Sequence, residues 1–76
     1  MLAVNGIMVK DKIGWLLRVK STRGSVRKGT YRLLEVPRHD YPDGLFVEIR
    51  GKLVDCADKY SCLKVDAIEP AIHNPL

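Results

Sequence analysis

The sequence predicts an all-β fold, a small barrel of about five strands with at most one helical turn. Apolar and polar residues alternate with a period of two in three separate segments, which is typical of half-buried strands. Glycine and proline residues separate those segments and mark turns. A closed barrel is favoured over an open sheet because it leaves no exposed strand edges.

The strands are expected at residues 7–9, 14–22, 30–36, 45–50 and 60–68. In the second of these, Trp15, Leu17 and Val19 alternate with basic residues, so the three apolar side chains face the core. The glycine-flanked polar stretch that follows is a hairpin loop.

The later elements are delimited by turn residues. Pro37 ends the third strand because proline cannot donate a ladder hydrogen bond. Asp43-Gly44 is a turn pair before the fourth strand, and Gly51-Lys52 turns the chain after it. Residues 53–55 form at most a short strand or bridge, and residues 55–59 allow one helical turn.

The chain has 76 residues, which is room for one domain. We expect residues 8–68 to form the barrel, residues 1–7 an N-terminal extension or edge strand, and residues 69–76 a loose tail. Met8 is an alternative start to Met1. No basic start with a signal core and no apolar run of about 20 residues is present, so we expect a cytoplasmic protein that does not bind membranes.

A resemblance supports the barrel. The order strand, basic loop, Lys28-Gly29-x-Tyr31-x-Leu33, hairpin, strand, Gly51 and final strand resembles the SH3-like small barrels. The similarity is greatest to short versions common in bacterial and phage genomes, and it covers residues 8–68. The acidic first loop and the tryptophan of peptide-binding SH3 domains are missing. The resemblance therefore implies a scaffold for binding, without a proline-rich peptide as ligand.

The two cysteines, Cys56 and Cys62, have five residues between them, unlike the C-x-x-C of a zinc or redox pair. We expect free thiols and no bound metal, as is usual in the cytosol. A zinc site with His39 and His73 is formally possible, and a disulfide would require a secreted context.

No catalytic constellation or cofactor motif stands out. Cys62 could be combined with a histidine and Asp40, but His39 lies in a turn and His73 in the tail, which hold side chains loosely. No phosphate-binding G-x-x-x-x-G-K-[ST] loop is present. We therefore expect no enzyme activity and no cofactor.

Positive charge is concentrated in one segment. The net charge is +4, yet residues 10–32 hold eight basic residues against Asp11 alone, a net of +7, and the remainder has a net of −3. A basic hairpin is predicted to bind an acidic protein surface or nucleic-acid phosphates, although a merely solvated hairpin is also possible. Its candidate binding residues are Arg18, Lys20, Arg23, Arg27, Lys28 and Arg32.

Three apolar residues, Leu16, Leu34 and Phe46, are out of phase with the core. They predict an exposed patch for a partner protein or a homo-oligomer, unless the closed barrel partly buries both faces. Trp15 and Tyr31 are in phase with the core, so the exposed aromatic platform of a single-strand binder is missing. The sequence thus favours a protein-binding adaptor or inhibitor, as encoded by a phage or mobile element and docking on a host protein. The alternative is a nucleic-acid-binding module that uses the hairpin at 18–32.

Overall fold

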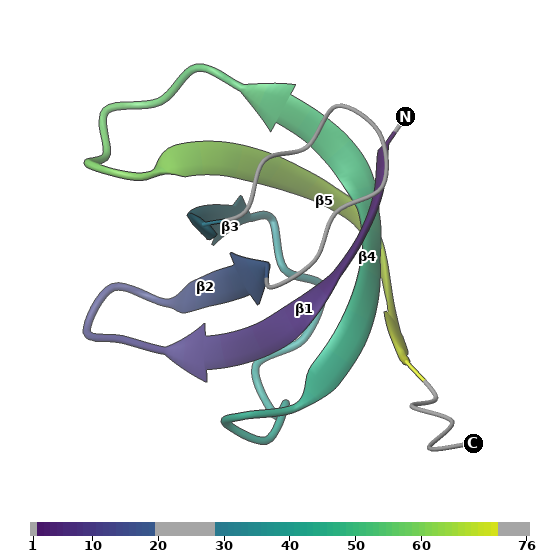
Figure 1. Cartoon of the computed structure of the whole chain (residues 1–76). Coiled ribbons are helices and arrows are strands. Elements are labelled where there is room, and N and C mark those ends of the chain that lie inside the picture. The colour runs from purple at the N-terminus through teal and green to yellow at the C-terminus, as the bar shows by residue number, and fades with distance from the viewer. Residues whose placement is uncertain (1, 20–28, 72–76) are drawn as a thin grey trace.

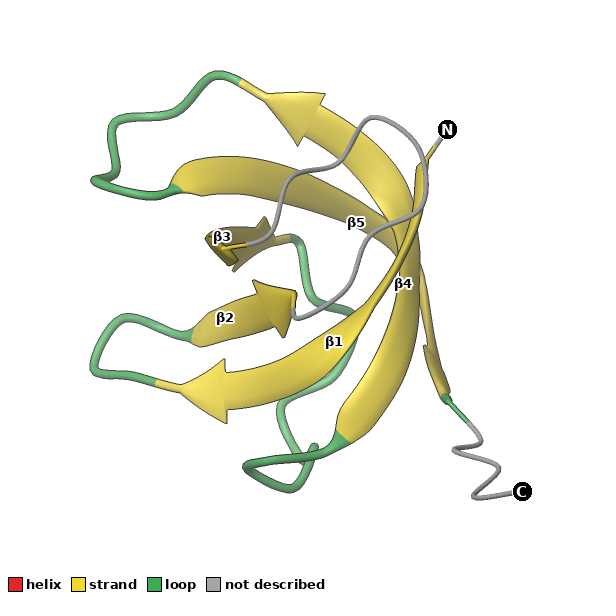
Figure 2. Ribbon diagram, in the orientation of Figure 1, coloured by secondary structure: helices red, strands yellow, loops and turns green. Residues whose placement is uncertain are grey.

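The computed structural model describes residues 2–19 and 29–71. These residues form β1 (Leu2–Lys10), β2 (Trp15–Val19), β3 (Gly29–Leu34), β4 (Phe46–Val54) and β5 (Ser61–Pro70). No helix occurs among them (Figure 2). The described part of the chain accordingly has no helix that could cross a membrane. The predicted all-β barrel of five strands is confirmed.

The barrel closes in the order β1-β2-β3-β5-β4 (Figure 1). β5 lies between β3 and β4, parallel to the first and antiparallel to the second. β1 is long enough to pair with both β2 and β4, which closes the circle. Five strands and closure make this a small β-barrel, and the SH3-like type stays a prediction from the sequence. The strand order itself is the Greek-key order of OB barrels.

The predicted alternation determines the core. Trp15, Leu17 and Val19 of β2 are buried, as are Tyr31 and Leu33 of β3, so the predicted inward phase of both strands is confirmed. Tyr41 lies on the connection between β3 and β4. Its ring packs edge-on against the ring of Trp15, with 6.2 Å between the ring centroids. The most completely buried large side chains are Met8, Leu17, Val47, Ile49, Cys62 and Leu63.

Gly51 does not turn the chain, in contrast to the prediction. β4 runs through it to Val54, and the register with β5 shifts between Arg50 and Gly51. A Cβ at position 51 would clash with the backbone carbonyl of Lys64. Glycine is therefore needed because the two strands approach closely where β4 bends. Of the short strand predicted at 53–55, Leu53 and Val54 form the end of β4 and Asp55 lies beyond it.

Both ends of the chain contribute more to the barrel than expected. β1 begins at Leu2, and residues 2–7 pair with β4, so most of the predicted extension is an integral strand. β5 continues to Pro70, two residues into the predicted tail, of which the structure describes only the start. The Asp43-Gly44 turn is confirmed, with Gly44 at φ 86°.

Candidate binding cleft

Arg32 is the only charged residue that is buried among those the structure describes, with 4% of its surface exposed. Its neighbours Tyr31 and Leu33 face the core, so Arg32 points to the outside of the barrel. The register places it between Leu16 of β2 and Cys62 of β5. A side chain there is buried only if something covers the outer face, and two loops do so.

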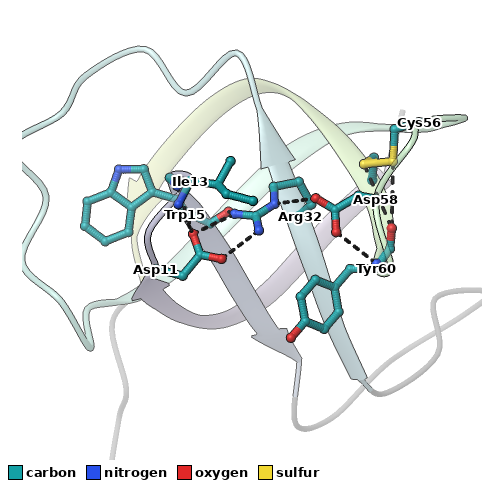
Figure 3. Close-up of polar contacts among 9 residues, drawn as sticks. Asp11, Ile13, Trp15, Arg32, Cys56, Asp58 and Tyr60 are labelled. Carbon is teal, nitrogen blue, oxygen red and sulfur yellow. Dashed lines mark hydrogen bonds and ion pairs between the residues drawn. A yellow bond between two sulfur atoms is a disulfide. The ribbon is translucent and has the colours of Figure 1, made fainter.

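The covering loops meet Arg32 through ion pairs (Figure 3). The guanidinium Nη1 and Nη2 donate to Oδ1 and Oδ2 of Asp11 over 2.9 and 2.6 Å, and Nε donates to Oδ2 of Asp58 over 2.9 Å. We call Arg32, Asp11 and Asp58 the ion triad. Asp11 follows β1 and Asp58 lies between β4 and β5, so one side chain fastens both loops to β3.

The triad stays ionised over the ordinary pH range. The side-chain hydrogen bonds from Arg32, followed by the backbone N–H groups of Gly14 and Ile13, hold the pKa of Asp11 well below its usual range. The backbone N–H of Tyr60 and then Arg32 lower the pKa of Asp58. Hydrogen bonding to Asp11 raises the pKa of Arg32 further above its high normal value. The triad therefore carries a net charge of −1.

Asp11 also shapes the turn between β1 and β2. Its Oδ1 accepts hydrogen bonds from the backbone N–H groups of Ile13 and Gly14 at 3.1 and 2.8 Å, and its own N–H donates to the Gly14 carbonyl at 2.9 Å. These three hydrogen bonds within residues 11–14 hold the Asx-type turn in place. The turn presents Ile13 to solvent, with 79% of that residue exposed.

The loop between β4 and β5 is closed by a disulfide between Cys56 and Cys62, whose Cα atoms are 6.1 Å apart. The prediction of free thiols is therefore wrong, because a tight turn brings together two cysteines that are six positions apart. While the S–S bond is intact, neither sulfur is a thiolate that could bind a zinc ion. Within the ring, the Tyr60 N–H donates to Asp58 Oδ1 over 3.1 Å, which positions Asp58 for Arg32.

Between the two loops lies a cleft of about 660 Å³ on the outer face of β2 and β3. Both loops extend from the same end of the barrel, at the left of Figure 1. Besides the ion triad, the cleft is lined by Lys12, Ile13, Leu16, Ala57, Lys59 and Tyr60. We call this space the docking cleft. It combines an apolar floor at Leu16, an exposed apolar lip at Ile13 and two lysines.

Only Arg18 and Arg32 of the predicted basic hairpin lie within the described residues. Arg18 is exposed on β2, as expected. Lys20, Arg23, Arg27 and Lys28 lie outside the described residues. Arg32 corrects the prediction, because it is buried and neutralised by two carboxylates and cannot contact a phosphate without breaking those bonds.

The predicted apolar patch is not formed. Leu16 is buried, with 8% exposed, and Leu34 and Phe46 are half-buried. All three are more exposed than Leu17, Leu33 and Val47, as predicted. No two of the three are cross-strand partners, however: Leu16 faces Val9 and Arg32, Leu34 faces Lys64, and Phe46 faces Ile7. The covering loops bury Leu16, so it contributes to the cleft floor instead.

Sequence reasoning missed Asp11, Asp58, Ile13 and Tyr60 as parts of one site. A usable signal existed for Asp11, which is the single acid among the bases of residues 10–32 and begins a short segment that ends in Gly14, a setting in which an Asp side chain accepts from the backbone N–H two residues on. For Asp58 and Tyr60 no local signal predicts proximity to Arg32, because that contact depends on the pairing of β3 with β5.

The chain matches no known protein family, and neither a curated protein nor a solved structure is significantly similar to it. The docking cleft is therefore the feature from which a function can be inferred.

Proposed function

We propose that this domain is a non-catalytic binding module whose docking cleft receives an apolar side chain flanked by acidic residues of a partner protein. The observation that carries the proposal is Ile13, an isoleucine that is 79% exposed on a turn fixed by three hydrogen bonds. A rigid apolar side chain beside an apolar floor is the arrangement of an interface anchor, since little conformational entropy is lost on binding.

The charges of the cleft favour an acidic protein over phosphates. Lys12 and Lys59 line it and form no ion pair with other described residues. Together with the net −1 of the ion triad they leave a formal charge of only +1, whereas phosphate-driven binding draws on many cationic contacts. Two lysines beside an apolar floor match a short segment with one apolar side chain and one or two carboxylates.

The proposal is tested with a photo-crosslinking amino acid at position 13, expressed in cells and compared with the same group at Lys52, an exposed residue of β4. We expect an adduct at position 13 that nuclease leaves intact and protease removes. Ile13→Asp should then lower capture of that partner about thirtyfold, the equivalent of a hot spot of about 2 kcal/mol. The control Leu53→Asp changes the other large apolar residue that is exposed in the described part of the chain and should have no such effect. Equal adducts at both positions would contradict the proposal.

A second candidate is single-stranded nucleic acid on the same face. OB barrels bind oligonucleotides on the outer face of their second and third strands, between the loops that flank the docking cleft here, although fold analogy alone gives no ligand. Against it, the ring of Tyr60 is already approached by the Lys59 ammonium, 5.1 Å from the ring centroid, and other exposed aromatics are not among the described lining of the cleft.

Oligothymidylate is the probe for this candidate. Nucleic acid would become the favoured ligand if two results are found. The logarithm of the binding constant should fall linearly with the logarithm of the salt concentration, with a slope of about −0.7 per neutralised phosphate. The double change Lys12→Ala/Lys59→Ala should abolish this binding. The cytoplasmic location and a homo-oligomeric state remain predictions from the sequence, and analytical ultracentrifugation of the purified chain measures the latter.

A further inference from the structure

One wall of the docking cleft is a covalent ring. The Cys56–Cys62 disulfide closes residues 56–62, and this ring carries Ala57, Asp58, Lys59 and Tyr60, all of which line the cleft. The state of a single S–S bond therefore bears on four of the nine residues that line the cleft.

The two sulfur-bearing residues differ in access. Cys62 is 2% exposed, within β5 and in register with Arg32 and Val54. Cys56 is exposed on the loop (Figure 3). A second open cavity, of about 430 Å³, is lined by both cysteines and by Lys59. A small thiol can reach the S–S bond there, although the carboxylates of Asp55 and Asp58 share the lining with the Lys59 ammonium.

We propose that Cys56 is a site of thiol–disulfide exchange with small thiols, and that this exchange opens the ring and loosens the wall of the docking cleft. The consequence for docking rests on the proposed function, but the exchange itself does not.

The chemistry is a two-step exchange. The thiolate of a small thiol attacks Cys56 Sγ, a mixed disulfide forms, the Cys56–Cys62 bond breaks, and Cys62 leaves as a thiolate that takes up a proton. A second thiolate attacks the small-molecule sulfur of the mixed disulfide and releases Cys56, which is protonated in turn. Two small thiols are thereby oxidised to one disulfide while the protein disulfide is reduced to two thiols.

The barrel is built to survive the opening. The Tyr60 carbonyl oxygen lies 3.7 Å from Cys56 Sγ and 4.0 Å from Cys62 Sγ, so either thiol hydrogen has an acceptor within reach once it forms. Cys62 stays in the ladders of β5, which are independent of the S–S bond. The freed segment is the loop, which the Asp58–Arg32 pair still fastens to β3.

The first test is partner-free and uses glutathione with the full chain. After brief exposure and alkylation, mass spectrometry of peptides should place the mixed disulfide on Cys56 at least tenfold more often than on Cys62. An adduct mainly on Cys62, or no adduct without denaturant, would overturn the proposal.

The second test measures amide hydrogen exchange with and without a thiol reductant. The amide of Tyr60, which donates to Asp58, should exchange at least tenfold faster when the ring is open, while amides of the β1–β4 ladder keep their protection. A Cys56→Ser/Cys62→Ala variant should show the fast rate in both conditions. Uniform loss of protection on reduction would mean that the disulfide holds the fold rather than the loop, and would refute the proposal.

The consequence for docking is measured last. Partner capture through position 13 should fall severalfold on reduction. If exchange occurs at Cys56 but capture is unchanged, the regulatory consequence is wrong; if no partner is captured in either state, the proposed function fails while the exchange site stands.

Discussion

Replacing Arg32 with methionine removes the one cation that Asp11 and Asp58 share. Methionine is flexible and long enough to fill the space, so the change reports charge more than packing. Three charge-assisted hydrogen bonds of 2.6 to 2.9 Å are lost. Removing one partner of a buried ion pair costs roughly 3–5 kcal/mol because the remaining charge is left uncompensated. The carboxylate side chains keep 29% and 17% exposure and can be hydrated, so we expect the lower end, about 3 kcal/mol.

Thermal unfolding followed by circular dichroism, with the disulfide intact, is the assay. A domain of this size loses about 4–8 °C per kcal/mol, so the midpoint at neutral pH should fall by about 12–24 °C. The matched control is Arg18→Met on the neighbouring strand, where the arginine is exposed and the change should stay within about 0.5 kcal/mol.

The pH dependence tests the electrostatic origin of this loss. The folded-state pKa values of Asp11 and Asp58 lie below their usual values. The stabilisation from the triad is therefore complete above the unfolded carboxyl pKa of about 4 and is lost as the pH falls through the folded values. The difference between the native chain and Arg32→Met should shrink between about pH 5 and pH 2. A difference that stays constant over this range would refute the reasoning and assign Arg32 a packing role alone.

Two further predictions concern the barrel. Gly51→Ala forces a Cβ against the Lys64 carbonyl and should lower the free energy of unfolding, measured in urea, by about 1–3 kcal/mol. In the control Gly14→Ala the new Cβ meets nothing within 4 Å, so the stability should be unchanged. Equal effects of the two changes would contradict the close approach at the β4 bend. Met8→Ala empties a fully buried position and should cost about 2–5 kcal/mol, enough to unfold much of the protein, while Ile13→Ala at the exposed turn should leave the unfolding midpoint nearly unchanged.

The alternation of residues along the chain was sufficient to assign the inward faces of β2 and β3. Trp15, Leu17 and Val19 are buried as predicted, because a strand with one face against a core must place every second residue inside. The glycine at position 51 was recognised as special but misread, since sequence does not tell a turn glycine from one that lets two strands approach.

What the sequence by itself determined, then, is the class of fold and the inward face of its strands, both of which depend on neighbours in the chain. Only the tertiary structure decided the fate of Arg32, whose carboxylate partners lie 21 and 26 positions away. Arg32 would be an unpaired cation if the two loops did not place Asp11 and Asp58 beside it. Barrel closure and the parallel pairing of β3 with β5 bring those loops over one outer face, so a residue predicted to bind a partner from the basic hairpin is instead the buried anchor of a cleft.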